Sequence, residues 1–246
     1  MAGLVRTLSA VTPWAFDRAA MTALGRAHHD AYHAASPFPH VVIDGLLGDD
    51  RSATLARAFP TADHPHWKRR DHVQQARLSQ LARSDFAEVA GELRWFLAEL
   101  GSQAFLDFLA AVTGQRGLIA DPHFTGAGPI ATLPGGHLAL HTDFNRDSAR
   151  HLDRAVTVLY YLPPTWDPAW GGDLELWDRT RSRCEVAIAP VRDRLVVMAH
   201  GADHWHGHPT PLRCPAGHLR AAVTAYYYLA RPAPGDDADA HGAVWA

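Results

Sequence analysis

The second half of the chain is a succession of short apolar runs separated by Gly, Pro and Asp. After Thr113-Gly114, eight such runs follow one another, at 129–133, 137–141, 155–162, 173–177, 184–189, 194–199, 203–206 and 219–229. Short strands at this spacing, with turn residues between them, are typical of an antiparallel sandwich or barrel. We therefore expect an α+β fold whose core is a double-stranded β-helix, or jelly roll, braced by helices.

The first half of the sequence is mainly helical in pattern. Helical spacing of apolar residues covers 14–35, 51–58 and 74–112, with a break expected at Gly101-Ser102, and a β-branched run at 38–44 predicts a strand. Residues 61–73 are polar and predict a loop, which could act as a lid. We interpret 1–246 as one domain, with a mainly helical support region at 1–115, a jelly-roll catalytic core at 116–231 and a flexible acidic tail at 232–246.

The amino-acid composition limits the kinds of molecule that the protein can be expected to bind. The net charge is −3 and no basic run is present, which disfavours binding to nucleic acid. No run of about 18 apolar residues exists, so we expect no membrane span, and the N-terminus does not resemble a signal peptide. Two cysteines, 184 and 214, have no metal-ribbon spacing and make no disulfide framework. We expect a cytoplasmic protein acting on a small-molecule or peptidyl substrate.

One triplet in these runs is suited to metal binding. His141 and Asp143 are two residues apart, so on an extended strand their side chains point to the same side. Two histidines and one carboxylate with open positions opposite form the ligand set of non-haem Fe(II) oxygenases. The sequence must therefore supply a second histidine from elsewhere.

A cluster of histidines follows 65 residues later. His204, His206 and His208 alternate with other residues after the strong apolar run 195–199. On a strand, all three would share one face, and any one of them could complete a site begun by His141 and Asp143. The pattern alone leaves His204 and His208 as competitors of His206.

Arg220 is a lone cation in an apolar run, and no acidic residue lies near it in sequence. Burying such a charge is costly unless it is paired. Thr224 lies four residues later and would share its face. A guanidinium and a hydroxyl on one inward face form a seat for a carboxylate.

At this point the chain from about 116 to 230 resembles the Fe(II)/2-oxoglutarate-dependent dioxygenases, in particular their prolyl-hydroxylase-like branch. The matching segments are His141-Thr142-Asp143, Tyr160-Tyr161-Leu162 ahead of Trp166, 171–176, 194–198, 205–209, and Arg220 followed by Thr224. Two departures from the family pattern are Leu133, where a Tyr is common, and the insertion 214–217 between His206 and Arg220.

The resemblance implies a role for each matching residue. His141, Asp143 and His206 would bind Fe(II). Arg220 would bind the distal carboxylate of 2-oxoglutarate, assisted by Thr224 and Tyr161.

The resemblance also implies an activity. With Fe(II), 2-oxoglutarate and O2, such an enzyme hydroxylates an unactivated C–H bond and releases succinate and CO2; Asp143, in place of Gly or Ala, favours hydroxylation over halogenation. By analogy with this branch, the substrate would be an amino acid, free or within a peptide or carrier-bound intermediate. Residues that flank the expected mouth are His137, Asn145, Arg146 and Trp166.

Two alternatives belong to other classes. The chain could be a non-catalytic double-sheet binding module, which would not need Arg220 and Thr224 beside three metal ligands. It could also be a zinc-dependent hydrolase using the same ligands, which would need a nearby general base and no carboxylate seat.

Overall fold

A computed structural model describes residues 14–65, 67–81, 91–121, 127–230 and 240–246. The helices are α1 (Arg18–Ala34), α2 (Asp49–Ala58), α3 (Gly91–Glu99), α4 (Gln103–Thr113) and the 3₁₀ helix η2 (Pro168–Trp170). The strands are β1 (His40–Asp44), β2 (Trp67–His72), β3 (Gln75–Leu81), β4 (Ile119–Ala120), β5 (Gly128–Thr132), β6 (His137–Thr142), β7 (Arg146–Asp147), β8 (Leu152–Tyr161), β9 (Leu174–Trp177), β10 (Cys184–Ile188), β11 (Arg194–Ala199), β12 (His206–His208), β13 (Arg220–Ala230) and β14 (Val244–Trp245).

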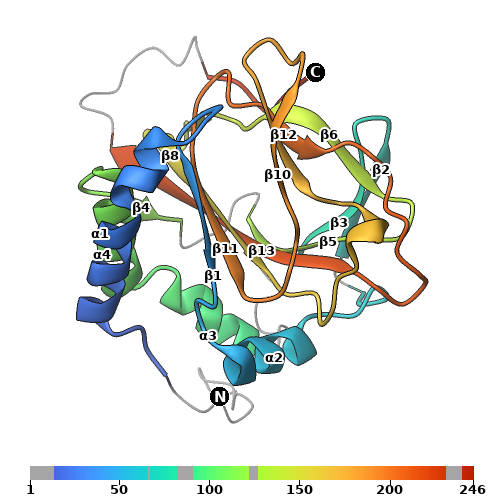
Figure 1. Cartoon of the computed structure of the whole chain (residues 1–246), viewed down its shortest axis with the longest axis horizontal. Coiled ribbons are helices and arrows are strands. Elements are labelled where there is room, and N and C mark those ends of the chain that lie inside the picture. Colours follow the sequence, from blue (N-terminus) through green and yellow to red (C-terminus); the bar gives the residue numbers. More distant parts are fainter. Residues whose placement is uncertain (1–13, 66, 82–90, 122–126, 231–239) are drawn as a thin grey trace, which may run out of the picture.

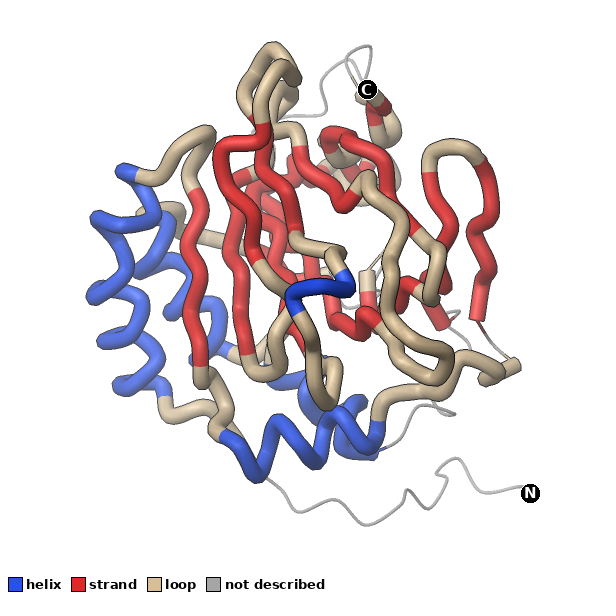
Figure 2. The backbone as a smooth tube through the Cα atoms, turned by 45° about the vertical axis from the view of Figure 1, so that its right-hand side comes forward, coloured by secondary structure: helices blue, strands red, loops and turns tan. Residues whose placement is uncertain are grey.

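The strands form one antiparallel sheet that rolls into two facing layers (Figure 1, Figure 2). The hydrogen-bonded order is β1-β11-β8-β13-β5 for the first layer, then β3, then β6-β12-β9-β10 for the second. Inward side chains of β8, β11 and β13 pack against Leu174, Leu176 and Ile188 of the second layer. The expected α+β jelly-roll fold is thereby confirmed. Seven of the eight runs predicted in the second half lie on strands, whereas of the run 203–206 only His206 does, at the start of β12.

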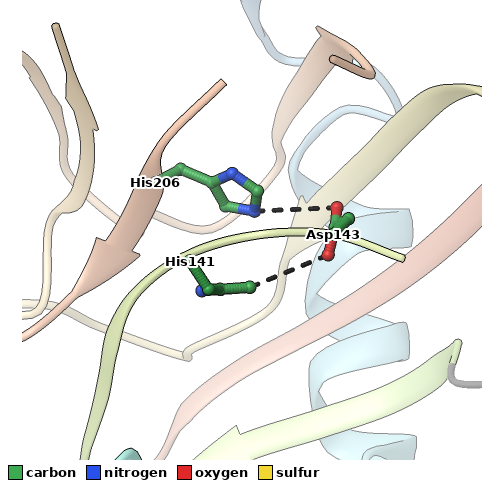
Figure 3. Close-up of side chains that lie close together, drawn as sticks. All are labelled: His141, Asp143 and His206. Carbon is green, nitrogen blue, oxygen red and sulfur yellow. Dashed lines mark ion pairs between the residues drawn. The ribbon is translucent and has the colours of Figure 1, made fainter. Parts of the chain in front are cut away.

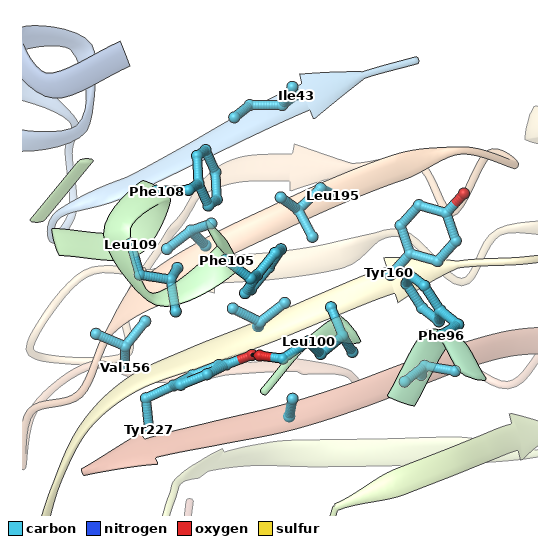
Figure 4. Packing of buried hydrophobic residues seen from close by; sticks show 14 of the residues in the cluster. Ile43, Phe96, Leu100, Phe105, Phe108, Leu109, Val156, Tyr160, Leu195 and Tyr227 are labelled. Carbon is cyan, nitrogen blue, oxygen red and sulfur yellow. Dashed lines mark hydrogen bonds between the residues drawn. The ribbon is translucent and has the colours of Figure 1, made fainter. Parts of the chain in front are cut away.

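The helices cover the outer face of the first layer (Figure 4). Along β8, Val156, Val158 and Tyr160 face the helices, whereas Leu159 and Tyr161 face the interior of the roll. This alternation is the period of two that an extended strand imposes. The helical apolar residues that meet them are fully buried, and include Phe96, Phe105, Phe108 and Leu109.

The predicted break between the last two helices is confirmed at Gly101-Ser102. The Ser102 side chain caps α4 by accepting a hydrogen bond from the Phe105 amide at 3.3 Å. Gly114 ends the same helix in the left-handed conformation, at φ 72°.

Among the described residues, no single helix is long and apolar enough to cross a membrane; α3 and α4, bent by 49° at their junction, pass this test only as a pair.

The structure corrects the prediction for 61–81. The segment expected to be a loop and the beginning of a helix is a hairpin, β2 and β3. Pairing with sheet neighbours explains the difference: Leu78 lies opposite Ala131 of β5, and Gln75 lies opposite Leu138 of β6. Such tertiary pairing overrides the local preference of a polar segment. Phe86 and Val89, which supported the predicted helix, lie outside the described residues.

The end of the chain is also different from the prediction of a flexible tail at 232–246. Residues 232–239 lie outside the described part, but Val244 and Trp245 form β14, which pairs with Thr142 and His141 of β6. The amide of Ala246 donates to the Leu140 carbonyl at 2.9 Å. We call residues 240–246 the C-terminal strap.

Candidate active site

The register between β6 and β12 places two histidines side by side. His141 and His206 are direct partners across the antiparallel pair, and their ring centroids are 4.5 Å apart. The strands approach closely at Gly207, where a Cβ atom would lie 2.8 Å from the carbonyl oxygens of Leu138 and Ala139. A glycine is therefore required there for the two imidazoles to meet.

Asp143 completes a cluster of three potential ligands (Figure 3). It directly follows β6, and its two carboxylate oxygens lie 3.7 Å from His141 Nε2 and 3.7 Å from His206 Nε2. One ligand atom from each residue lies within 4.8 Å of the others. Two imidazoles and one carboxylate at this spacing form a possible Fe(II) site.

Both imidazoles are oriented for metal binding. His141 Nδ1 lies 3.0 Å from the Ala139 carbonyl, and His206 Nδ1 lies 2.9 Å from the His204 carbonyl. A carbonyl oxygen only accepts, so Nδ1 is the donor in both contacts, which leaves Nε2 of each ring as the atom available to a metal. Burial, reinforced by the nearby His206, lowers the pKa of His141 to about 3, which keeps this ring neutral at physiological pH.

Asp143 is held by a buried arginine that the sequence analysis did not single out. Arg154 Nη2 donates to Asp143 Oδ2 at 2.7 Å and to Thr157 Oγ1 at 3.0 Å. The Arg154 side chain is fully buried, with its guanidinium 3.4 Å from the ring centroid of Tyr226 and 4.5 Å from that of Phe144. Burial alone would raise the pKa of Asp143, but the charge of Arg154 and the two histidines hold it well below its usual range.

Of the three clustered histidines, only His206 belongs to the ligand group. The prediction that all three share one strand face is wrong for His204, which precedes β12, whereas His206 and His208 both line the cavity. His204 Nδ1 lies 2.9 Å from the Ala199 carbonyl and its ring stacks on Phe38. His208 Nε2 instead lies 3.3 Å from Thr132 Oγ1.

Arg220 and Thr224 share the inward face of β13, as predicted, and both line the cavity that contains the three ligands. Arg220 is buried; its Nε donates to the Gly172 carbonyl and its Nη2 to the Tyr161 hydroxyl at 3.1 Å. Gly172 has φ +79°, and a Cβ atom there would lie 2.5 Å from Leu212, so this contact also requires a glycine. Among the described residues, no carboxylate pairs with Arg220.

The four residues predicted to contact substrate lie outside this cavity and have contacts of their own. His137 Nε2 is 3.1 Å from the Val73 carbonyl, and the Trp166 indole donates to the Gly171 carbonyl at 3.0 Å. Asn145 accepts from the His241 amide at 2.9 Å, and Arg146 forms an ion pair with Asp153 at 2.9 Å. Their role in substrate binding stays a prediction.

Two more residues at the site were missed by sequence reasoning. Arg77 of β3 lines the cavity, and Trp245 of the strap lies over His141 with ring centroids 5.1 Å apart. Arg77 was assigned to a helix, and no local pattern indicates that Trp245 returns to β6.

Comparison with known proteins agrees with this geometry. The sequence model of the 2OG-Fe(II) oxygenase superfamily matches residues 129–228, which contain the three ligands, Arg220 and Thr224. Residues 129–228 thus carry the sequence pattern of a 2OG-Fe(II) oxygenase domain. The enzyme is therefore a dioxygenase that depends on Fe(II), 2-oxoglutarate and O2. No curated protein matches the chain by sequence.

Solved structures show the same fold at low sequence identity. A prolyl hydroxylase from Trichoplax adhaerens, in complex with a hypoxia-inducible-factor peptide, has a TM-score of 0.60 at 18% identity, covering 85% of this chain and 91% of that one. A prolyl-4-hydroxylase from Pseudomonas putida has a TM-score of 0.59 at 19% identity, covering 84% of this chain and 100% of that one. A prolyl 4-hydroxylase from Phytophthora capsici has a TM-score of 0.56 at 20% identity, covering 95% of this chain and 71% of that one. The fold is thus prolyl-hydroxylase-like.

Proposed function

We propose that this enzyme is a hydroxylase in which His141, Asp143 and His206 hold Fe(II), and Arg220 holds 2-oxoglutarate. The observation that carries the proposal is the convergence of three ligand atoms within 4.8 Å in a cavity that also contains a buried arginine. The donor set fits the ion, since two neutral imidazoles and one carboxylate leave part of the coordination sphere open. The buried, positively charged Arg220 fits a carboxylate.

Each residue of the chain has a defined task in this proposal. When bound, iron and 2-oxoglutarate supply the oxidising chemistry, with release of succinate and CO2. Arg220 binds the distal carboxylate, while the Tyr161 hydroxyl and the Gly172 carbonyl fix the direction of its guanidinium fork. Thr224, on the same face, adds a hydroxyl to this seat. Arg154 keeps Asp143 ionised and directed at the histidines.

The substrate we propose is an amino acid, either free or within a peptide or a carrier-bound intermediate. Support comes from the prolyl-hydroxylase-like fold, and the link is an analogy. A zinc hydrolase is disfavoured by the cavity itself. Among the described residues, Asp143 is the one carboxylate that lines it, and Arg154 already binds that group, so no free carboxylate is present there to act as a general base.

The first test is optical and needs no substrate. Under anaerobic conditions, Fe(II) and 2-oxoglutarate added to the purified protein should give the weak visible absorption band of the chelate. His141→Ala should lack the band because it removes one of the three ligands. A wild-type protein that binds iron but gives no band would contradict the proposal.

A further inference from the structure

The cavity beside the ligand triad contains a second arginine that the proposed reaction does not use. Arg77 lies on β3, on the same face as Gln75, whose side-chain oxygen accepts from Arg77 Nε at 2.7 Å. Arg77 lines the cavity together with His141, Asp143, His206 and Arg220. The β2–β3 hairpin therefore brings a further guanidinium to the place where a substrate must meet the metal.

Arg77 and Arg220 differ from the other partly or fully buried arginines of the sheet. Arg154 pairs with Asp143 at 2.7 Å, Arg146 with Asp153 at 2.9 Å, and Arg194 with Asp44 at 2.6 Å. Within the described ranges, neither Arg77 nor Arg220 has a carboxylate partner, and these two line the reaction cavity. A desolvated guanidinium without a counter-charge is costly, so the arrangement favours an anion that arrives with a ligand.

The formal charges of the loaded site would sum to +2, which favours the binding of a further anion. The Fe(II) dication and the 2-oxoglutarate dianion cancel each other, and Arg154 cancels Asp143. Burial keeps His141 and His208 neutral by lowering both pKa values. Arg77 and Arg220 then remain uncompensated. 2-Oxoglutarate has two carboxylates: one chelates the metal and one occupies Arg220, so Arg77 is left for a different molecule.

We propose that Arg77 binds a carboxylate of the substrate that is hydroxylated, so that the substrate is a free amino acid or a similar small carboxylic acid. This inference rests on the proposed function and selects one of the substrate forms that it left open. A peptide residue or a carrier-bound acyl group has no free carboxylate next to its Cα, and would leave Arg77 unpaired. Burial lowers the pKa of Arg77, and the nearby Tyr226 and Asp143 offset part of this effect.

The test separates cosubstrate binding from substrate binding. Wild type, Arg77→Gln, Arg77→Lys and the matched control Arg69→Gln would each be loaded anaerobically with Fe(II) and titrated with 2-oxoglutarate, following the visible band. Arg69 lies on β2 of the same hairpin and is exposed, so its substitution makes the same charge change outside the cavity. We expect all four proteins to form the band with 2-oxoglutarate affinities within about threefold, because Arg220 is intact in each.

The second step adds the substrate probes. The common free L-amino acids and their carboxamides, which keep the side chain but lose the negative charge, would be added to each loaded protein. Binding would be read from the change in the band, and succinate formation would be measured after oxygen is admitted. In wild type and Arg69→Gln, we expect at least one free acid to bind about tenfold more tightly than its amide. In Arg77→Gln this preference should disappear, and Arg77→Lys should restore part of it.

Each contrary outcome has a definite meaning. Amides that bind as well as the acids, or free acids that leave the wild-type band unchanged throughout the series, would overturn the assignment of Arg77. Loss of the 2-oxoglutarate band in Arg77→Gln would also overturn it, and would place Arg77 in the cosubstrate seat. Failure of the proposed function itself looks different, since then the wild-type protein would give no band before any probe is added.

Discussion

At the scale of single residues, the most demanding side chain in the molecule is Arg154. Its charge is fully buried, and among the described residues its Nε and Nη1 atoms have no hydrogen-bond partner. The Asp143 carboxylate and the faces of Phe144 and Tyr226 compensate that charge. The cost is tolerated where it fixes the orientation of a metal ligand, as the partners of ligating carboxylates commonly do.

Replacing Arg154 should therefore weaken metal binding. We expect Arg154→Gln to lower Fe(II) or Mn(II) affinity by about tenfold to a hundredfold, because Asp143 loses the donor that holds it. Anaerobic isothermal titration calorimetry would measure this, with circular dichroism to confirm folding. Arg194→Gln is the matched control, since it breaks a different arginine–carboxylate pair, with Asp44. Equal affinities in a folded Arg154→Gln variant would refute the assigned role.

The site residues that could be predicted from the sequence are those whose spacing alone places them on one face of a strand. His141, Asp143, Arg220 and Thr224 were accessible because period-two spacing on a strand already places the members of each pair on one face. Arg154 was not accessible by the argument used for Arg220, because Asp153 directly precedes it and offers a partner in the sequence. Spacing alone did not distinguish His206 from its neighbours; the family resemblance selected it, and in the structure it is the histidine directly opposite His141.

At the scale of elements, two segments complete the edge of β6 that carries His141. The hairpin strand β3 pairs with its beginning, at His137 and Leu138, and β14 pairs with its end, at His141 and Thr142. His72 of the hairpin also contacts Trp245 of the strap, at 6.4 Å between ring centroids. Both segments were assigned wrongly from sequence, because their strands are polar or very short and are stabilised by partners far away in the chain.

The strap should protect β6 from local opening. Trp245→Ala removes the ring that covers His141 and weakens the short β14 pairing. We expect faster amide deuterium exchange, followed by mass spectrometry, in peptides that cover 137–142. Peptides that cover 194–199, in the middle of the first layer, serve as the internal reference and should not change. If exchange at 137–142 stayed at the wild-type rate, the strap would have no stabilising role there.

At the scale of the whole molecule, the sheet separates two environments. Helices pack on one face of the first layer with mainly apolar contacts, and the polar site occupies the interior between the two layers. This organisation was predictable, because eight short alternating runs can bury both faces only in a double sheet braced by helices. The exact pairing of the strands could not be predicted, because many antiparallel neighbours in the roll come from distant parts of the chain.

Buried histidines should make the metal-free protein acid-sensitive. Burial lowers the pKa of His40, and burial with the charge of Arg154 lowers that of His200 to about 4. Histidines of the unfolded chain bind protons below about pH 6.5, whereas these two histidines of the folded protein stay neutral to lower pH. The free energy of unfolding therefore has its full value above about pH 6.5 and decreases as the pH falls towards 4. For His200 the loss between pH 7 and pH 5 is about 1–2 kcal/mol.

Denaturant unfolding of the metal-free protein across this pH range would measure the effect. His200→Gln should flatten the dependence of stability on pH, whatever it does to stability at pH 7. The exposed His33 of α1 provides the control, and His33→Gln should keep the wild-type slope. An unchanged slope in His200→Gln would rule out its contribution.

The contact between Trp245 and His141 also gives the molecule an optical property. An indole 5.1 Å from an imidazole that can hold a transition metal lies within the range where a paramagnetic ion quenches its fluorescence. The chain has eight tryptophans, but among the described ring contacts Trp245 is the one that touches a ligand of the proposed iron site, so Trp245→Phe provides the spectrum to subtract. The strap thereby makes the occupancy of the site visible in intrinsic emission, without a label and without turnover.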